Sequence, residues 1–225
     1  TRGLPVSHAP GVNHEDVADH ALGLILAARR QIVSGDRQVR NGEWKVETRT
    51  ITPSLAGQKL GIVGLGHIGR AVAQRAGVFR MEVSWWGPRP HEADWSRADS
   101  LLALAQASDI LVVACKADET NRGLISREIL RALGPDGLLV NVSRGQVVDE
   151  DALIEALKTG ALGQAALDVF QDEPTDPARW ADVPNVVLTP HTAGATTAGV
   201  QGMLVLLIEN LQAHFAGQAL KTPVA

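Results

Sequence analysis

Four ionisable side chains of the types that transfer protons and bind anions lie in the second half of the chain. Arg144, Asp168, Glu173 and His191 each end or closely follow a short apolar run. A histidine paired with a carboxylate can act as a general acid or base, and an arginine presents a planar set of donors that matches a carboxylate. Side chains of these types can do this chemistry together where the fold brings them to one place.

Each of the four also has a structural explanation. Arg144 stands beside a glycine and could cap a turn, Asp168 could cap a helix, and a glutamate before a proline, as at Glu173, is common in loops. Their common placement favours function, because all four come at the carboxyl ends of predicted strands, where open α/β sheets bind ligands.

A glycine pattern of the form G-x-G-x-x-G lies directly after an apolar run at 60–63 and before an alanine-rich segment that can form a helix. In this context the pattern is typical of a dinucleotide site. Gly64 would permit the tight turn, Gly66 would let a pyrophosphate approach the backbone, and Gly69 would let the helix pack on the strand. The alternative is that the glycines serve only the turn. The predicted cofactor-binding residues of this loop are Gly64, Gly66, His67, Ile68 and Gly69.

The segments that would position these residues alternate between strand-like and helix-like patterns. Strand-like runs, apolar on both faces as in a sheet covered by helices, occupy 60–63, 82–86, 110–114, 138–142, 165–168 and 186–188. Helix-like segments run from the glycine loop to 79 and over 101–107, 126–133 and 150–159. The alternation predicts an α/β fold with a doubly wound, Rossmann-like parallel sheet.

The N-terminal part precedes this alternation. Residues 4–7 read as a short strand, and apolar residues at helical spacing predict a long helix over 17–32, capped by Asn13. His14 and His20 fall in this region and are predicted to be surface or packing histidines, with no partners at the spacing of a metal site.

Two further segments lie outside the alternation. Residues 29–52 are polar and poorly periodic, which predicts an irregular arm of the kind that often wraps a partner subunit. Burying such an arm on a second copy gives a homodimer. A final helix is predicted over 197–216.

The bulk composition is ordinary for a globular protein. The chain has 225 residues, a formal net charge of -4 and a pI near 6.0, which argues against a surface for nucleic acid or anionic membrane. No apolar run reaches the roughly 18 residues of a membrane span and no signal-peptide pattern opens the sequence, so a cytoplasmic location is expected. The lone Cys115 is predicted to lie in a buried strand without a role.

Three stretches together resemble the D-2-hydroxyacid dehydrogenase family. They are Asn-Val-Ser-Arg-Gly-Gln-Val-Val-Asp-Glu from 141, Leu-Asp-Val-Phe-Gln-Asp-Glu-Pro from 167, and Leu-Thr-Pro-His-Thr-Ala-Gly-Ala-Thr from 188. The glycine loop and the helical segment from 15 to 26 fit as well. Within the family, the chain is most similar to glyoxylate and hydroxypyruvate reductases.

The resemblance implies a reaction and a role for each of the four residues. Arg144 would bind the carboxylate of a 2-oxo acid, and Asp168 would orient the carboxamide of the nicotinamide. His191 would give a proton to the alkoxide that forms as hydride arrives, and Glu173 would hold the ring tautomer and favour the charged donor. The implied substrates are glyoxylate and hydroxypyruvate.

The resemblance also implies a division into domains. Residues 1–12 would be the last strand of a substrate domain, 13–196 the dinucleotide-binding domain, and 197–225 a helix that returns to the substrate domain. In the family, a further segment of about 100 residues upstream of Thr1 forms most of that substrate domain. Only its tail is expected here.

The dinucleotide preference is predicted from the end of the second strand. About 20 residues after its glycine loop, an NAD site places a carboxylate on the ribose 2′-hydroxyl, but here Gly87 stands near that position and Arg89 follows. Arginine suits a 2′-phosphate, so NADP is predicted, with NAD as the second choice. The other interpretation of Arg89 is a solvated turn residue.

Two other functions fit the sequence less well. One is a non-catalytic, dinucleotide-sensing dimer similar to the corepressors related to this family, which the full set of Arg144, Glu173 and His191 disfavours. The other is formate dehydrogenase, a relative that has a glutamine where Glu173 stands.

Overall fold

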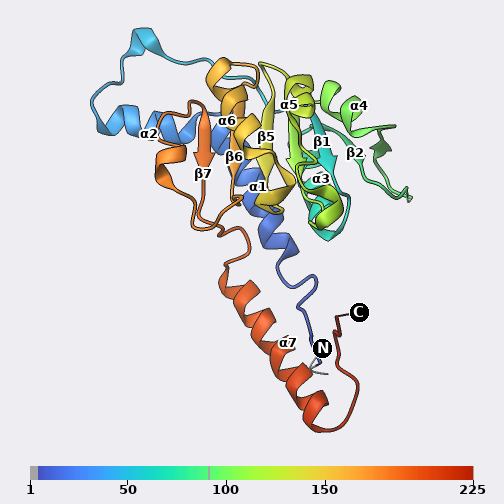
Figure 1. Cartoon of the computed structure of the whole chain (residues 1–225). Coiled ribbons are helices and arrows are strands. Elements are labelled where there is room, and N and C mark those ends of the chain that lie inside the picture. The colour runs from blue at the N-terminus through green and yellow to red at the C-terminus, as the bar shows by residue number, and fades with distance from the viewer. Residues whose placement is uncertain (1–4, 91, 225) are drawn as a thin grey trace.

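The computed structural model describes residues 5–90 and 92–224, and a parallel sheet of seven strands lies at its centre (Figure 1). The strands are β1 (Lys59–Val63), β2 (Glu82–Trp86), β3 (Ser96–Arg97), β4 (Ile110–Val113), β5 (Leu138–Asn141), β6 (Gln164–Leu167) and β7 (Val186–Leu188). Their order across the sheet is β3-β2-β1-β4-β5-β6-β7. The first strand, β1, lies inside the sheet, and later strands are added on both of its sides, which confirms the predicted doubly wound fold.

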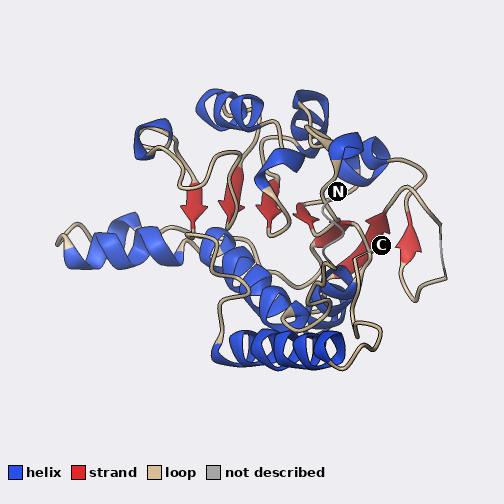
Figure 2. Cartoon of the chain, turned by 60° about the horizontal axis from the view of Figure 1, so that its bottom comes forward, coloured by secondary structure: helices blue, strands red, loops and turns tan. Residues whose placement is uncertain are grey.

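Helices cover both faces of the sheet (Figure 2). One face carries α1 (His14–Arg29) and α3 (His67–Val78), and the other carries α4 (Leu101–Gln106), α5 (Arg127–Leu133) and α6 (Glu150–Thr159). Every residue of β4 and β5 is buried, because side chains on both faces of these strands meet a helical layer. The continuous apolar runs of the sequence follow from this double cover.

Helix α1 ends at Arg29, three residues before the predicted end. The Arg29 guanidinium is buried and lies across the starts of the strands, where it donates to the carbonyl oxygens of Asp109 and Asp136 and to Oε1 of Gln164. Arg29 is the last residue of α1, so the prediction that began the irregular arm at residue 29 was wrong. Asn13 occupies the predicted N-cap position and its carbonyl accepts from the N–H of Val17 at 3.0 Å, but its side chain makes no capping hydrogen bond.

The arm itself contains a helix that the sequence did not predict. Helix α2 (Ile32–Arg40) is followed by a loop with one short 3-10 turn, η1 (Val46–Thr48), and the whole segment projects from the body of the sheet (Figure 1). No residue of α2 is buried. The helix lacks the buried apolar face whose periodicity would have revealed it.

The last helix, α7 (Thr197–Phe215), leads away from the sheet and brings the C-terminal segment beside the N-terminal one (Figure 1). His8 N–H donates to the carbonyl of Thr222 at 3.1 Å, and Val224 N–H donates to that of Val6 at 2.9 Å. The predicted strand at 4–7 is reduced, in its described part, to one antiparallel bridge between Ser7 and Pro223. Among the described residues, no helix is long and apolar enough to cross a membrane.

Candidate active site

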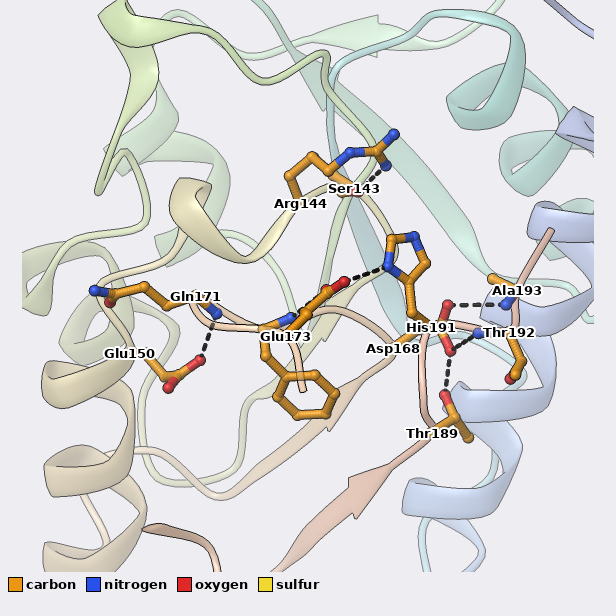
Figure 3. Close-up of polar contacts among 11 residues, drawn as sticks. Ser143, Arg144, Glu150, Asp168, Gln171, Glu173, Thr189, His191, Thr192 and Ala193 are labelled. Atoms are coloured by element: carbon orange, nitrogen blue, oxygen red, sulfur yellow. Dashed lines mark hydrogen bonds and ion pairs between the residues drawn. The ribbon is translucent and has the colours of Figure 1, made fainter. Parts of the chain in front are cut away.

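The loops that follow β5, β6 and β7 bring the four predicted residues to one edge of the sheet (Figure 3). Arg144, Asp168 and His191 line one pocket of about 450 Å³. An adjoining pocket of about 450 Å³ shares Ile68 and Arg144 with it and extends to His67. The structure thus joins the predicted acid–base residues and the predicted glycine loop in one continuous region.

The loop that carries Arg144 is fixed by the buried side chain of Asn141. Asn141 Oδ1 accepts from the N–H of Ser143 at 3.0 Å, and its Nδ2 donates to the carbonyl of Arg144 at 3.1 Å. Ser143 Oγ ties the loop to the neighbouring strand end by donating to the carbonyl of Cys115 at 2.7 Å. Among the residues that the structure describes, the Arg144 guanidinium donates only to the Ser143 carbonyl, which leaves its other donors for a ligand.

Glu173 and His191 form a close pair. Oε2 of Glu173 lies 2.6 Å from Nδ1 of His191, and Oε1 accepts from the N–H of Phe170 at 3.0 Å. Partial burial by itself would raise the pKa of Glu173, but the hydrogen bonds from His191 and Phe170 and the charges of His191 and Arg144 outweigh it and lower this pKa. Glu173 therefore stays ionised at neutral pH, and Nε2 of His191 is the ring atom left for a ligand.

His191 is held in a tight backbone turn. Its φ of 53° lies in the left-handed region, which residues other than glycine adopt infrequently. Its N–H donates to the carbonyl of Thr189 at 3.0 Å. Strained backbone of this kind clusters at functional sites, where the surrounding structure holds it in place.

Asp168 is almost fully buried, and its carboxylate is held by three donors. Oδ1 accepts from the hydroxyl of Thr189 at 2.6 Å and from the N–H of Thr192 at 2.9 Å, and Oδ2 accepts from the N–H of Ala193 at 2.8 Å (Figure 3). A carboxylate has about four acceptor positions, so these donors leave about one, and Asp168 is among the residues that line the pocket.

His20 contacts residues of the candidate site, although the sequence predicted a surface or packing histidine. Its Nε2 lies 3.0 Å from Oγ1 of Thr189 and 3.4 Å from Oδ1 of Asp168. The hydroxyl of Thr189 donates to Asp168, so it can accept from His20 at the same time. The link crosses from α1 to the end of β7, and a contact between residues so distant in sequence gives no local signal.

The glycine loop has the space that a dinucleotide needs. A Cβ at Gly64 would lie 2.6 Å from Cα of Cys115, and one at Gly69 would lie 2.2 Å from the Gly64 carbonyl oxygen, so both glycines are required by packing. A Cβ at Gly66 would meet nothing within 4 Å. The open space at Gly66 faces the start of α3, whose free N–H groups favour a phosphate, so these residues fit a bound dinucleotide.

A further pocket of about 430 Å³ extends from the glycine loop along the ends of β2 and β4. Trp86, Arg89 and Cys115 are among its lining residues, and Arg89 is exposed. The prediction for Cys115 was wrong, because β4 ends at Val113 and the thiol is only partly buried. That burial still raises its pKa, which keeps the thiol protonated.

Among the described residues, no group of three or more histidine, cysteine and acidic side chains could hold a metal ion.

Comparison with protein families matches residues 22–193 to the NAD-binding domain of the D-isomer-specific 2-hydroxyacid dehydrogenases. The chain belongs to this family. Its fold and its membership are therefore as the sequence predicted, and it is an oxidoreductase of the 2-hydroxyacid dehydrogenase class. Two relatives are a glyoxylate/hydroxypyruvate reductase of Arabidopsis thaliana, 44% identical over 225 residues, and a hydroxyphenylpyruvate reductase of Plectranthus scutellarioides, 43% identical over 224 residues. The alignments span 99% of this chain and 72% of each relative.

Two solved structures superpose closely on this 2-hydroxyacid dehydrogenase chain. A Thermus thermophilus protein gives a TM-score of 0.94 at 36% identity, covering 100% of this chain and 72% of that one. An NADPH-dependent glyoxylate/hydroxypyruvate reductase of Sinorhizobium meliloti, in complex with NADP and malonate, gives 0.92 at 37% identity, covering 100% and 71%.

Proposed function

We propose that this 2-hydroxyacid dehydrogenase reduces small 2-oxo acids, with glyoxylate and hydroxypyruvate as leading substrates and NADPH as the preferred cofactor. The observation that carries the proposal is the pocket shared by Arg144 and His191, with Glu173 bonded to the far side of the imidazole ring. A carboxylate binder and a proton donor at one pocket suit a substrate whose carboxylate and carbonyl are adjacent.

The residues divide the work as follows. Arg144 binds the substrate carboxylate with the guanidinium donors that Ser143 does not use. His191 donates from Nε2 to the carbonyl oxygen, while Glu173 holds Nδ1 and stabilises the charged ring. Asp168, fixed by Thr189 and two backbone N–H groups, borders the same pocket and orients the cofactor's carboxamide. When bound, the reduced nicotinamide supplies the hydride.

The preference for NADPH rests on Arg89. It lies in the pocket that runs from the glycine loop past Trp86, and the chain has Gly87 where an NAD site would place a carboxylate. The structure of the Sinorhizobium meliloti relative contains NADP. We assign Gly64, Gly66, His67, Ile68 and Gly69 to the phosphate-binding part of the same site.

We also propose the domain division 1–12, 13–196 and 197–225 and a homodimer. The backbone hydrogen bonds between the two end segments support a shared unit outside the sheet domain. Exposed apolar side chains on the projecting arm, Val39, Trp44 and Ile51 among them, support burial of the arm on a second copy.

Steady-state assays test the function. Purified protein supplied with NADPH should reduce glyoxylate and hydroxypyruvate, and it should turn over with a lower efficiency on NADH. Tight dinucleotide binding without turnover of any 2-oxo acid would instead support the non-catalytic, dinucleotide-sensing dimer.

A further inference from the structure

Glu150 is a buried carboxylate outside the residues assigned above. It is the first residue of α6, and its side chain is only 6% exposed. A carboxylate buried to this extent is costly unless charged or polar partners satisfy it. The partners of Glu150 therefore indicate what the structure uses it for.

Within the described part of the chain, the partners of the Glu150 carboxylate lie on the loop that carries Glu173. Oε2 of Glu150 accepts from the N–H of Gln171 at 2.9 Å, and Oε1 accepts from Nε of Arg179 at 3.1 Å, with Nη2 at 3.0 Å. Gln171 comes shortly before Glu173 in the chain, and Arg179 comes after it, at the end of the 3-10 turn η4 (Pro177–Arg179). The Glu150 carboxylate thus links the start of the 170–180 loop, at Gln171, to its end, at Arg179.

The segment at Phe170 and Gln171, which Glu150 contacts, also positions the side chain of Glu173. Oε1 of Glu173 accepts from Phe170 N–H, next to the Gln171 N–H that Glu150 accepts (Figure 3). The same segment lies against Gly145, where a Cβ would lie 1.8 Å from the carbonyl carbon of Phe170. The Phe170–Gln171 peptide therefore contacts Gly145, beside Arg144, and donates its N–H to Glu150.

We infer that Glu150 is a positioning residue that fixes the 170–180 loop so that Glu173 stays in contact with His191. The inference rests on the proposed function for its catalytic consequence, but the geometric link from Glu150 through Gln171 and Phe170 to Glu173 does not depend on the substrate.

Removing the Glu150 carboxylate has a defined physical effect. The N–H of Gln171 loses its charged acceptor, and Arg179 keeps its contact with the exposed Asp151, to which Nη2 donates at 2.8 Å. The loop therefore gains freedom. Glu173 then spends less time against His191. A misplacement of about 1 Å in a catalytic group can lower a rate by up to roughly 100-fold.

The test compares Glu150→Ala and Glu150→Gln with a matched control, Asp151→Ala. The control removes the neighbouring carboxylate, 84% exposed, that also binds Arg179, and leaves Glu150 intact. The first readout is the pKa of the Glu173 carboxyl group, measured by NMR on protein labelled with carbon-13 at glutamate side chains. The second is kcat and KM for glyoxylate in the full-length protein.

In Glu150→Ala, the lowered pKa of Glu173 should rise toward its ordinary value, and kcat should fall by roughly 10- to 100-fold while KM changes little, because Arg144 is untouched. Glu150→Gln keeps one acceptor oxygen and should show smaller changes in the same direction, and it decides the question if the alanine variant does not fold. Asp151→Ala should have the same Glu173 pKa, kcat and KM as the unsubstituted protein.

A Glu173 pKa and a kcat in both Glu150 variants equal to those of Asp151→Ala would overturn the inference. If no 2-oxo acid is reduced by the unsubstituted protein, the proposed function fails, and the NMR measurement alone then decides the role of Glu150.

Discussion

Oε2 of Glu173 and Nδ1 of His191 lie 2.6 Å apart, although the side chains come from different loops, after β6 and after β7. The side chains are 36% and 43% exposed, so solvent reaches the pair from one side. In the proposed mechanism the remaining ring nitrogen of His191 donates the proton, and the Glu173 carboxylate stabilises the charged form of the ring.

Glu173→Gln should move the alkaline fall of the reduction rate to lower pH. The pKa of Glu173 is lowered in the folded protein, so its side chain is negatively charged throughout the neutral range. The charge is lost only as the pH falls through that lowered pKa. Replacing it with a neutral amide removes the charge that favours imidazolium. The shift is measured in the pH profile of kcat/KM for glyoxylate, with Asp172→Asn in the same loop as the control. Identical profiles for the unsubstituted protein, Glu173→Gln and Asp172→Asn would exclude a functional pair of Glu173 and His191.

Gly66→Ala and Gly69→Ala should separate cofactor binding from folding. A Cβ at Gly66 meets open space, so this variant should melt like the unsubstituted protein but bind NADPH at least roughly 10-fold more weakly, because the methyl group occupies space needed by the pyrophosphate. A Cβ at Gly69 would lie 2.2 Å from a backbone oxygen, so this variant should lose thermal stability. Calorimetry and a melting curve measure both effects. Unchanged NADPH affinity in Gly66→Ala would place the dinucleotide elsewhere.

Arg89→Ala should weaken NADPH binding by roughly 10- to 100-fold, because a charge-assisted contact to phosphate contributes about 1.5 to 3 kcal/mol. NADH binding should stay nearly the same. Lys158→Ala, at an exposed position on α6, is the control for a general loss of positive charge. Equal weakening of both cofactors in the Arg89 variant would show that this arginine does not contact the 2′-phosphate.

The arm should mediate dimerisation. Sedimentation at micromolar concentration is expected to show a dimer, and aspartate at Val39 or Ile51, which are 61% and 94% exposed, should shift it toward monomer. Val78→Asp, at an 83% exposed apolar position outside the arm, should leave the dimer unchanged. A monomer in the unsubstituted protein contradicts this proposal.

The centre of the sheet could be predicted from the sequence because its strands β4 and β5 are buried on both faces. Every residue of β4 is apolar and buried, which leaves a run that can be read without knowing the fold. The two residues of β3 are both exposed, and α2 buries no residue, so neither leaves such a pattern. Local periodicity records burial, and elements without burial escape it.

The site divides in the same way. Arg144, Asp168, Glu173 and His191 could be proposed because strand ends of a parallel sheet meet at one edge. The contacts of His20 and Glu150 could not, since each depends on how a helix packs against a distant loop. Glu150 in particular stands in the first turn of a helix, where acidic residues are common, so its sequence position gives no sign of its contacts.

The central claim is that His191 is the proton donor of a 2-oxo acid reductase, and His191→Ala tests it most directly. Steady-state kinetics with NADPH and glyoxylate should show kcat reduced by roughly 10²- to 10⁴-fold, the usual contribution of general acid catalysis. The dissociation constant of NADPH, measured on the same preparation, should be nearly unchanged, because the glycine loop is intact. A variant that reduces glyoxylate at a near-normal rate would contradict the account.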